Sequence, residues 1–144
     1  MSLYVVEWER SRLLTLGPAM VLVDCGEGTA DAWTRSGLRP WGPDAVLFTG
    51  PKAAQIAGLY GLLDAMSAAD RSEPIRLLHG LDNEGVGNLV GAFLQSEQCP
   101  YPVALEADRP GAVLMVGGLR CASKATHQGL RWSISGEGRE VSFG

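Results

Sequence analysis

The spacing of hydrophobic residues predicts short buried strands that alternate with helices in the first two thirds of the chain. Residues 19–23 and 45–48 are apolar runs, typical of strands buried on both faces. Thr49-Gly50-Pro51 marks a helix start, and apolar residues recur at helical spacing through 52–69. A further helix is expected at 82–95. The remaining elements expected here are strands at 3–8, 13–16 and 75–78 and a helix at 30–36.

The last third of the chain predicts antiparallel strands separated by Gly and Pro turns. These strands are expected at 101–106, 112–116, 119–123, 130–134 and 140–143. The element order indicates an α+β protein, with a mixed sheet and its three helices on one face. A length of 144 residues fits one compact domain, so residues 1–144 are treated as a single unit.

Composition narrows the classes of function. Hydrophobic residues make up 46% and charged residues 19%, which suits a folded core. The net charge of −4 disfavours non-specific nucleic-acid binding. No apolar run reaches the roughly 20 residues that span a bilayer, and the N-terminus lacks a signal-peptide pattern. We therefore expect a cytoplasmic protein without a membrane partner.

Cysteine and histidine are too few and too scattered to indicate a metal site or a disulfide framework. Cys25, Cys99 and Cys121 form no Cys-x-x-Cys pair, so they are expected to be reduced thiols. His79 and His127 are the two histidines. No catalytic residue, metal or cofactor is assigned from this composition.

Three stretches carry a family resemblance. A buried strand runs into Asp24-Cys25-Gly26-Glu27-Gly28-Thr29, and Gly37-Leu38-Arg39-Pro40 follows the next helix. Phe48-Thr49 and Gly58-Leu59 flank a second loop, and Ala125-Thr126-His127 precedes Gly129-Leu130-Arg131-Trp132. This pattern resembles the ribonuclease Z branch of the metallo-β-lactamase superfamily. The resemblance implies the N-terminal half of an αββα sandwich, as one αβ layer pair.

The loop that binds metal in that family is degenerate in this chain. The resemblance places Gly50 and Lys52 at two His positions, Ala54 at an Asp position and Gln55 at a further His position. Gly and Ala have no side-chain donor, Lys is a cation, and zinc needs three or four converging N, S or carboxylate ligands. His127 remains as a remnant ligand position, and no zinc is expected.

The motif residues have structural interpretations. Asp24 is expected to accept backbone N–H bonds from the glycine turn that follows its strand, with proton transfer as the alternative. Glu27 suits the positive end of a helix. The two glycines around it form only part of an anion-binding fingerprint. His79 and His127 are expected to be a turn residue and a strand residue, respectively.

Three classes of function remain open. The leading hypothesis is a non-catalytic ribonuclease Z-like scaffold that acts in binding or assembly with a protein partner. One alternative is a metal-dependent hydrolase that processes tRNA 3′ ends, as the resemblance implies. The other is an RNA-binding accessory subunit, if its basic residues cluster; the candidates are Arg10, Arg12, Arg120, Lys124 and Arg131.

A sheet with helices on one face leaves its other face without cover. Strands 19–23 and 45–48 are apolar at both parities, so we expect that face to be buried. The predicted cover is a second copy, which makes a homodimer through the exposed sheet face. Cover by strands 112–143, or by a different protein, is the alternative.

Overall fold

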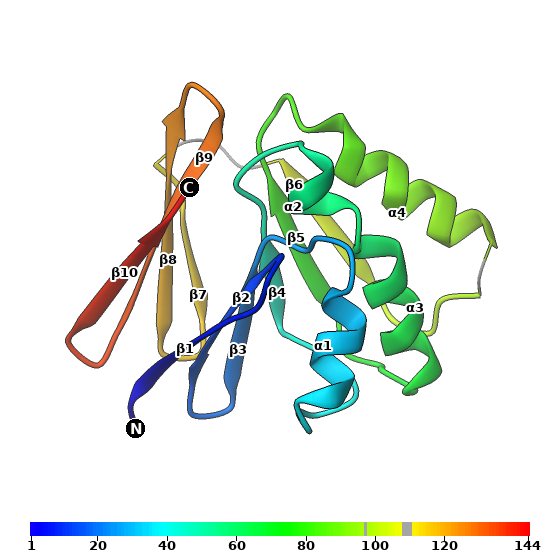
Figure 1. Cartoon of the computed structure of the whole chain (residues 1–144), viewed down its shortest axis with the longest axis horizontal. Helices are drawn as coiled ribbons and strands as arrows, with labels where there is room; N and C mark the ends of the chain where they lie inside the picture. The colour runs from blue at the N-terminus through cyan, green and yellow to red at the C-terminus, as the bar shows by residue number, and fades with distance from the viewer. Residues whose placement is uncertain (97, 108–110) are drawn as a thin grey trace.

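The computed structural model describes residues 1–96, 98–107 and 111–144, which form three layers (Figure 1). Helices form the first layer, a six-stranded sheet the second and a four-stranded sheet the third. Within those ranges, no helix is long and apolar enough to cross a membrane. The elements are β1 (Leu3–Glu7), β2 (Arg12–Leu16), β3 (Ala19–Val23), α1 (Thr29–Arg35), β4 (Ala45–Leu47), α2 (Ala53–Ile56), α3 (Leu59–Ala68), β5 (Ile75–His79), α4 (Glu84–Ser96), β6 (Val103–Ala107), β7 (Val113–Val116), β8 (Leu119–Thr126), β9 (Gly129–Gly136) and β10 (Arg139–Phe143).

The six-stranded sheet has its strands in sequence order, from β1 to β6. Strands β1 to β3 pair antiparallel, whereas β3 to β6 pair parallel because a helical connection separates each pair. All helices lie on the same face of this sheet (Figure 1). The predicted α+β class and the mixed sheet with helices on one face are confirmed.

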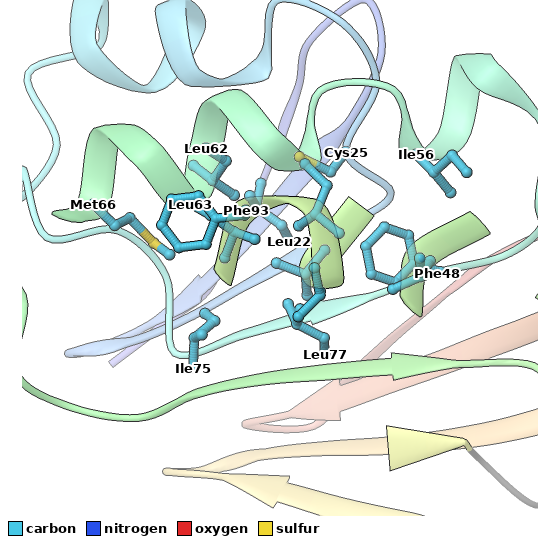
Figure 2. Close-up of a cluster of buried hydrophobic side chains, with 14 of the residues drawn as sticks. Leu22, Cys25, Phe48, Ile56, Leu62, Leu63, Met66, Ile75, Leu77 and Phe93 are labelled. Carbon is cyan, nitrogen blue, oxygen red and sulfur yellow. The ribbon is translucent and has the colours of Figure 1, made fainter. Parts of the chain in front are cut away.

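One hydrophobic core lies between the helices and the six-stranded sheet, and the apolar residues at helical spacing face it. Leu62, Leu63 and Met66 of α3 point toward the sheet, where they meet Leu22 and Leu77 (Figure 2). Their neighbours in the strands, such as Val21 and Val23, face the opposite side. Strand β3 is therefore buried on both faces, as its consecutive apolar residues predict.

The four-stranded sheet, in the order β10-β9-β8-β7, covers the second face of the six-stranded sheet. Its strands alternate, so that Cys121, Leu130, Trp132 and Ile134 face the core between the sheets. The Trp132 indole N–H also donates to the Phe48 carbonyl oxygen at 3.0 Å.

The interpretation of one αβ layer pair with a bare face is therefore wrong. The last strands pair among themselves and pack face to face on the first sheet, as the alternative proposed. The uncovered face on which the homodimer prediction depended is already buried within the chain. The oligomeric state itself stays a prediction.

The single helix expected at 52–69 is also wrong, because it breaks into α2 and α3 around Gly58. The Gly58 N–H donates to the Cys25 carbonyl oxygen at 2.9 Å instead of continuing the first helix. A Cβ atom at Gly58 would overlap the Gly26 carbonyl. A tertiary contact with the glycine-rich turn thus sets the break, and the described part of the chain has four helices instead of the three expected.

A buried arginine holds together the two loops that precede the parallel strands β4 and β5. Arg71 is 3% exposed, and its guanidinium donates to the carbonyl oxygens of Trp41, Pro43, Glu73 and Pro74 at 2.6 to 2.8 Å. These bonds give the guanidinium N–H groups carbonyl acceptors and join the loop before β4 to the loop before β5.

Candidate functional site

A polar cleft lies where β3 and β4 end. It has a volume of about 460 Å³, and its lining includes Asp24 and Thr49, which follow these two strands. The tip of the β1–β2 hairpin, residues 7–12, forms one wall, and Ala54 and Gln55 of α2 form another. The carboxyl ends of parallel strands are a common location for ligand sites in α/β proteins.

Asp24 connects the two strand ends. Its side chain is a hydrogen-bond acceptor for Thr49 twice, from the backbone N–H at 2.8 Å and from the hydroxyl at 2.6 Å. The residue is 5% exposed and has a φ of 62°, in the left-handed region. Burial raises the pKa of Asp24, and the Thr49 bonds partly offset that effect. The donors are those of Thr49 and not the N–H groups of the glycine turn, which were the expected partners of Asp24.

Gln55 closes the loop that carries the degenerate metal positions. Its side-chain oxygen accepts from the Lys52 N–H at 3.0 Å, and its side-chain nitrogen donates to the Thr49 hydroxyl at 3.1 Å. A Cβ atom at Gly50 would lie 2.6 Å from the Gln55 oxygen and 3.1 Å from the Gln128 carbonyl oxygen. Position 50 therefore has no room for a side chain while Gln55 makes these bonds.

The glycine-rich turn, residues 24–29, is joined to this loop by a backbone hydrogen bond. The Cys25 N–H donates to the Gln55 carbonyl oxygen at 2.8 Å, and the Gly26 N–H donates to the Arg10 carbonyl oxygen at 3.0 Å. Gly28 precedes α1 at φ 90°, and the Thr29 hydroxyl donates to the Gly26 carbonyl oxygen at 2.7 Å. Burial raises the pKa of the Cys25 thiol to about 12, so the thiol stays protonated at neutral pH.

The two histidines lie apart from the cleft lining. His127 is exposed in the turn between β8 and β9, and not within a strand as expected. That turn approaches the loop, because the Leu130 N–H donates to the Thr49 carbonyl oxygen at 2.9 Å. His79 ends β5, with its Nδ1 atom 2.8 Å from the Gly80 carbonyl oxygen.

The residues present do not fit the metal that the family resemblance implies. Gly50 and Ala54 have no donor atom, and the side-chain oxygen and nitrogen of Gln55 are both occupied by hydrogen bonds. Within residues 1–96, 98–107 and 111–144, no group of three or more His, Cys, Asp or Glu side chains is placed to hold a metal ion. His127 alone is insufficient for a zinc site.

The predicted basic cluster forms only in part. Lys124 and Arg131 lie opposite each other on β8 and β9, and Arg120 shares their sheet face by strand alternation. All three are exposed on the outer face of the four-stranded sheet. Arg10 and Arg12 instead line the cleft.

Arg12 is a site residue that motif matching did not indicate. Its guanidinium carbon lies 5.2 Å from the ring centroid of Phe143 on the second sheet. The β2–β3 pairing places it opposite Val23, beside Asp24. The signal available in the sequence was the hairpin pattern at residues 12–23, which sets this register.

Known proteins resemble the chain in sequence and in structure. It is 41% identical to ribonuclease Z of Clostridium kluyveri over 87 residues, which are 59% of this chain and 27% of the relative. Human tRNase Z, short form, superposes with a TM-score of 0.71 at 15% identity, covering 92% of this chain and 60% of the human chain. A metallo-β-lactamase fold protein from Bacillus subtilis gives a TM-score of 0.68 at 19% identity, covering 92% of this chain and 52% of the bacterial one. No family model matches.

The fold and these similarities identify the class. The chain has the metallo-β-lactamase fold, and about half of it is similar in sequence to ribonuclease Z, in line with the motif resemblance. Its matches span about a quarter of the length of the curated relatives, from 23% to 28%.

Proposed function

We propose that this chain is a non-catalytic, ribonuclease Z-like scaffold that acts in binding or assembly in the cytoplasm. The observation that supports the proposal most is the hydrogen-bonded path from Lys52 through Gln55 and Thr49 to Asp24. It keeps the loop closed through the side chain of Gln55, which stands at one of the family's metal-ligand positions. A scaffold of this kind retains the fold and the cleft without a bound metal.

A hydrolysis assay tests this proposal. The wild-type chain and ribonuclease Z of C. kluyveri, as a positive control, are given a precursor tRNA with a 3′ extension, with and without added zinc. The proposal predicts no cleavage by this chain in either condition, because metal-assisted hydrolysis needs a bound, activated water. Zinc-dependent cleavage at the 3′ end would instead establish the hydrolase alternative.

An RNA-binding accessory subunit is the second candidate. It is favoured by the exposed Arg120, Lys124 and Arg131 on one sheet face, although the chain carries a net charge of −4. RNA binding through these residues would weaken as the salt concentration rises. The affinity for RNA would also fall in a variant in which Arg120, Lys124 and Arg131 are all replaced by Gln. A titration with tRNA at two salt concentrations separates this candidate from the scaffold, for which no salt-dependent binding is expected.

The homodimer remains part of the proposal in altered form. Strands β7 to β10 cover the face of the six-stranded sheet that the helices leave open. The sheet face available for a second copy is therefore the outer face of the four-stranded sheet. Val113 and Met115 on β7 are 49% and 57% exposed there. Sedimentation equilibrium at micromolar concentration is expected to show a dimer that the double Val113→Lys, Met115→Lys variant dissociates; a wild-type monomer would overturn it.

A further inference from the structure

The polar cleft holds charges of opposite sign that do not meet. Asp24 and Arg12 both line it, yet no ion pair joins them among the residues that the structure describes. Both Asp24 oxygens are bonded to Thr49, which leaves the carboxylate without a cationic partner in contact. A buried carboxylate is costly to ionise unless a cation or further donors reach it.

The Arg12 guanidinium packs on an aromatic ring and makes no ion pair with Asp24 among the described residues. The guanidinium carbon lies 5.2 Å from the ring centroid of Phe143, and this contact joins the hairpin to β10. A guanidinium offers five N–H donors, so it retains donors for an oxyanion in the cleft. The cleft therefore presents an acceptor on Asp24 and free donors on Arg12.

We propose that this cleft binds a small zwitterion with the backbone of an amino acid or a dipeptide. Its ammonium group donates to the Asp24 carboxylate, and its carboxylate accepts from the Arg12 guanidinium. One ligand of this kind satisfies both side chains, whereas a simple anion would face Asp24 and a simple cation would face Arg12.

The other walls suit the same ligand. A volume of about 460 Å³ lies within the range of roughly 300–1,000 Å³ that is usual for small-molecule sites. Trp8 lines the cleft and is held edge-on to Trp33, with ring centroids 6.2 Å apart, so it supplies a fixed aromatic wall. Glu7, Glu9 and Arg10 of the hairpin also line the cleft, so charged groups of both signs surround the space between Asp24 and Arg12.

This inference rests on the proposed non-catalytic function, because a metal in the adjacent loop would compete for the same space. Its test is isothermal titration calorimetry with glycylglycine as the probe. Acetate, methylammonium and inorganic phosphate serve as single-charge comparators. A dissociation constant of about 1 mM or tighter is expected for glycylglycine, with no measurable heat from the comparators.

Two variants assign the contacts. Asp24→Asn and Arg12→Gln are each expected to weaken binding of glycylglycine by about tenfold or more. Asp70→Asn is the matched control for the first, since Asp70 also has a positive φ, of 58°, and lies outside the cleft lining. If circular dichroism shows that Arg12→Gln does not fold, Arg12→Lys replaces it. This variant keeps the charge but lacks the guanidinium group that contacts the carboxylate of glycylglycine.

The outcomes separate this inference from the proposed function. Equal binding of acetate or phosphate, unchanged binding in Asp24→Asn, or no binding of glycylglycine to the folded wild type would each overturn the zwitterion site. None of these results alters the expectation of inactivity toward precursor tRNA. Zinc-dependent cleavage would overturn the function even if glycylglycine bound.

Discussion

Substitution of Gly26 by alanine tests the contact on which the site is built. Gly26 lies between the β1–β2 hairpin and the α2 loop, where its N–H donates to the Arg10 carbonyl oxygen at 3.0 Å. A Cβ atom there would overlap both the Ala54 carbonyl oxygen and the Arg10 Cβ atom. Both obstacles are backbone or backbone-attached atoms, so they cannot rotate away. Alanine at this position must therefore move the hairpin or the loop.

The expected loss of stability in Gly26→Ala comes from overpacking and from one lost hydrogen bond. Overpacking in a close-packed interior costs about 1–3 kcal/mol. Loss of the hydrogen bond between Gly26 and Arg10 adds about 1 kcal/mol. The free energy of unfolding should thus fall by about 2–4 kcal/mol, which lowers the melting temperature of a domain of this size by roughly 10 °C.

Urea unfolding followed by tryptophan fluorescence and circular dichroism measures this change. Gly61→Ala is the matched control, because Gly61 lies within α3 and nothing is within 4 Å of its Cβ position. An open helical position should gain about 0.5–1 kcal/mol from alanine. If Gly26→Ala were as stable as wild type, or if the two variants shifted stability alike, the close approach at the turn would be refuted.

Two further predictions concern buried charge. Burial raises the pKa of Asp24, so its contribution to stability is complete below the unfolded pKa and is lost as pH rises through the folded pKa. Relative to wild type, Asp24→Asn should therefore become more stable from pH 4 to pH 8 in urea titrations; a difference that shrinks with rising pH would contradict this. Arg71→Met should lower the free energy of unfolding by about 3 kcal/mol, because four carbonyl oxygens lose their donor. Arg35→Met on the exposed surface is the control and should change it by less than about 0.5 kcal/mol.

The strands and helices of the first two layers could be predicted because local patterns determine them. The apolar runs at residues 19–23 and 45–48 are buried on both faces, so their composition alone indicates central strands. The helix break at Gly58 could not be predicted in this way, because it depends on contacts with Cys25 and Gly26. Helical periodicity continues across the break and conceals it.

The position of the second sheet also depends on information absent from local patterns. Alternation in β8 and β9 predicts one buried face, as seen for Leu119, Cys121, Leu130 and Trp132. That pattern suits strands that extend the first sheet and strands that pack on top of it. The choice is made by long-range contacts such as the bond from Trp132 to Phe48.

The candidate site was predictable in position but not in detail. The motif from Asp24 to Thr29 and the loop from Gly50 to Gln55 were both indicated by the resemblance, and both support the cleft. The bonds of Thr49 to Asp24 and Gln55 could not be anticipated, since each joins side chains whose orientation depends on the fold. In the sequence Arg12 is one of several basic residues, and its place in the cleft follows from strand register.

Elemental analysis of the purified chain shows whether the loop at residues 50–55 lacks a bound metal ion. Protein prepared without chelator from zinc-supplemented cells is measured for transition metals, with carbonic anhydrase carried through the same steps as a zinc-retaining control. We expect far less than one metal ion per chain, because no ligand set is supplied by Gly50, Lys52, Ala54 and Gln55. One zinc ion per chain that is lost in His127→Ala would contradict it and would restore the metal-dependent hydrolase.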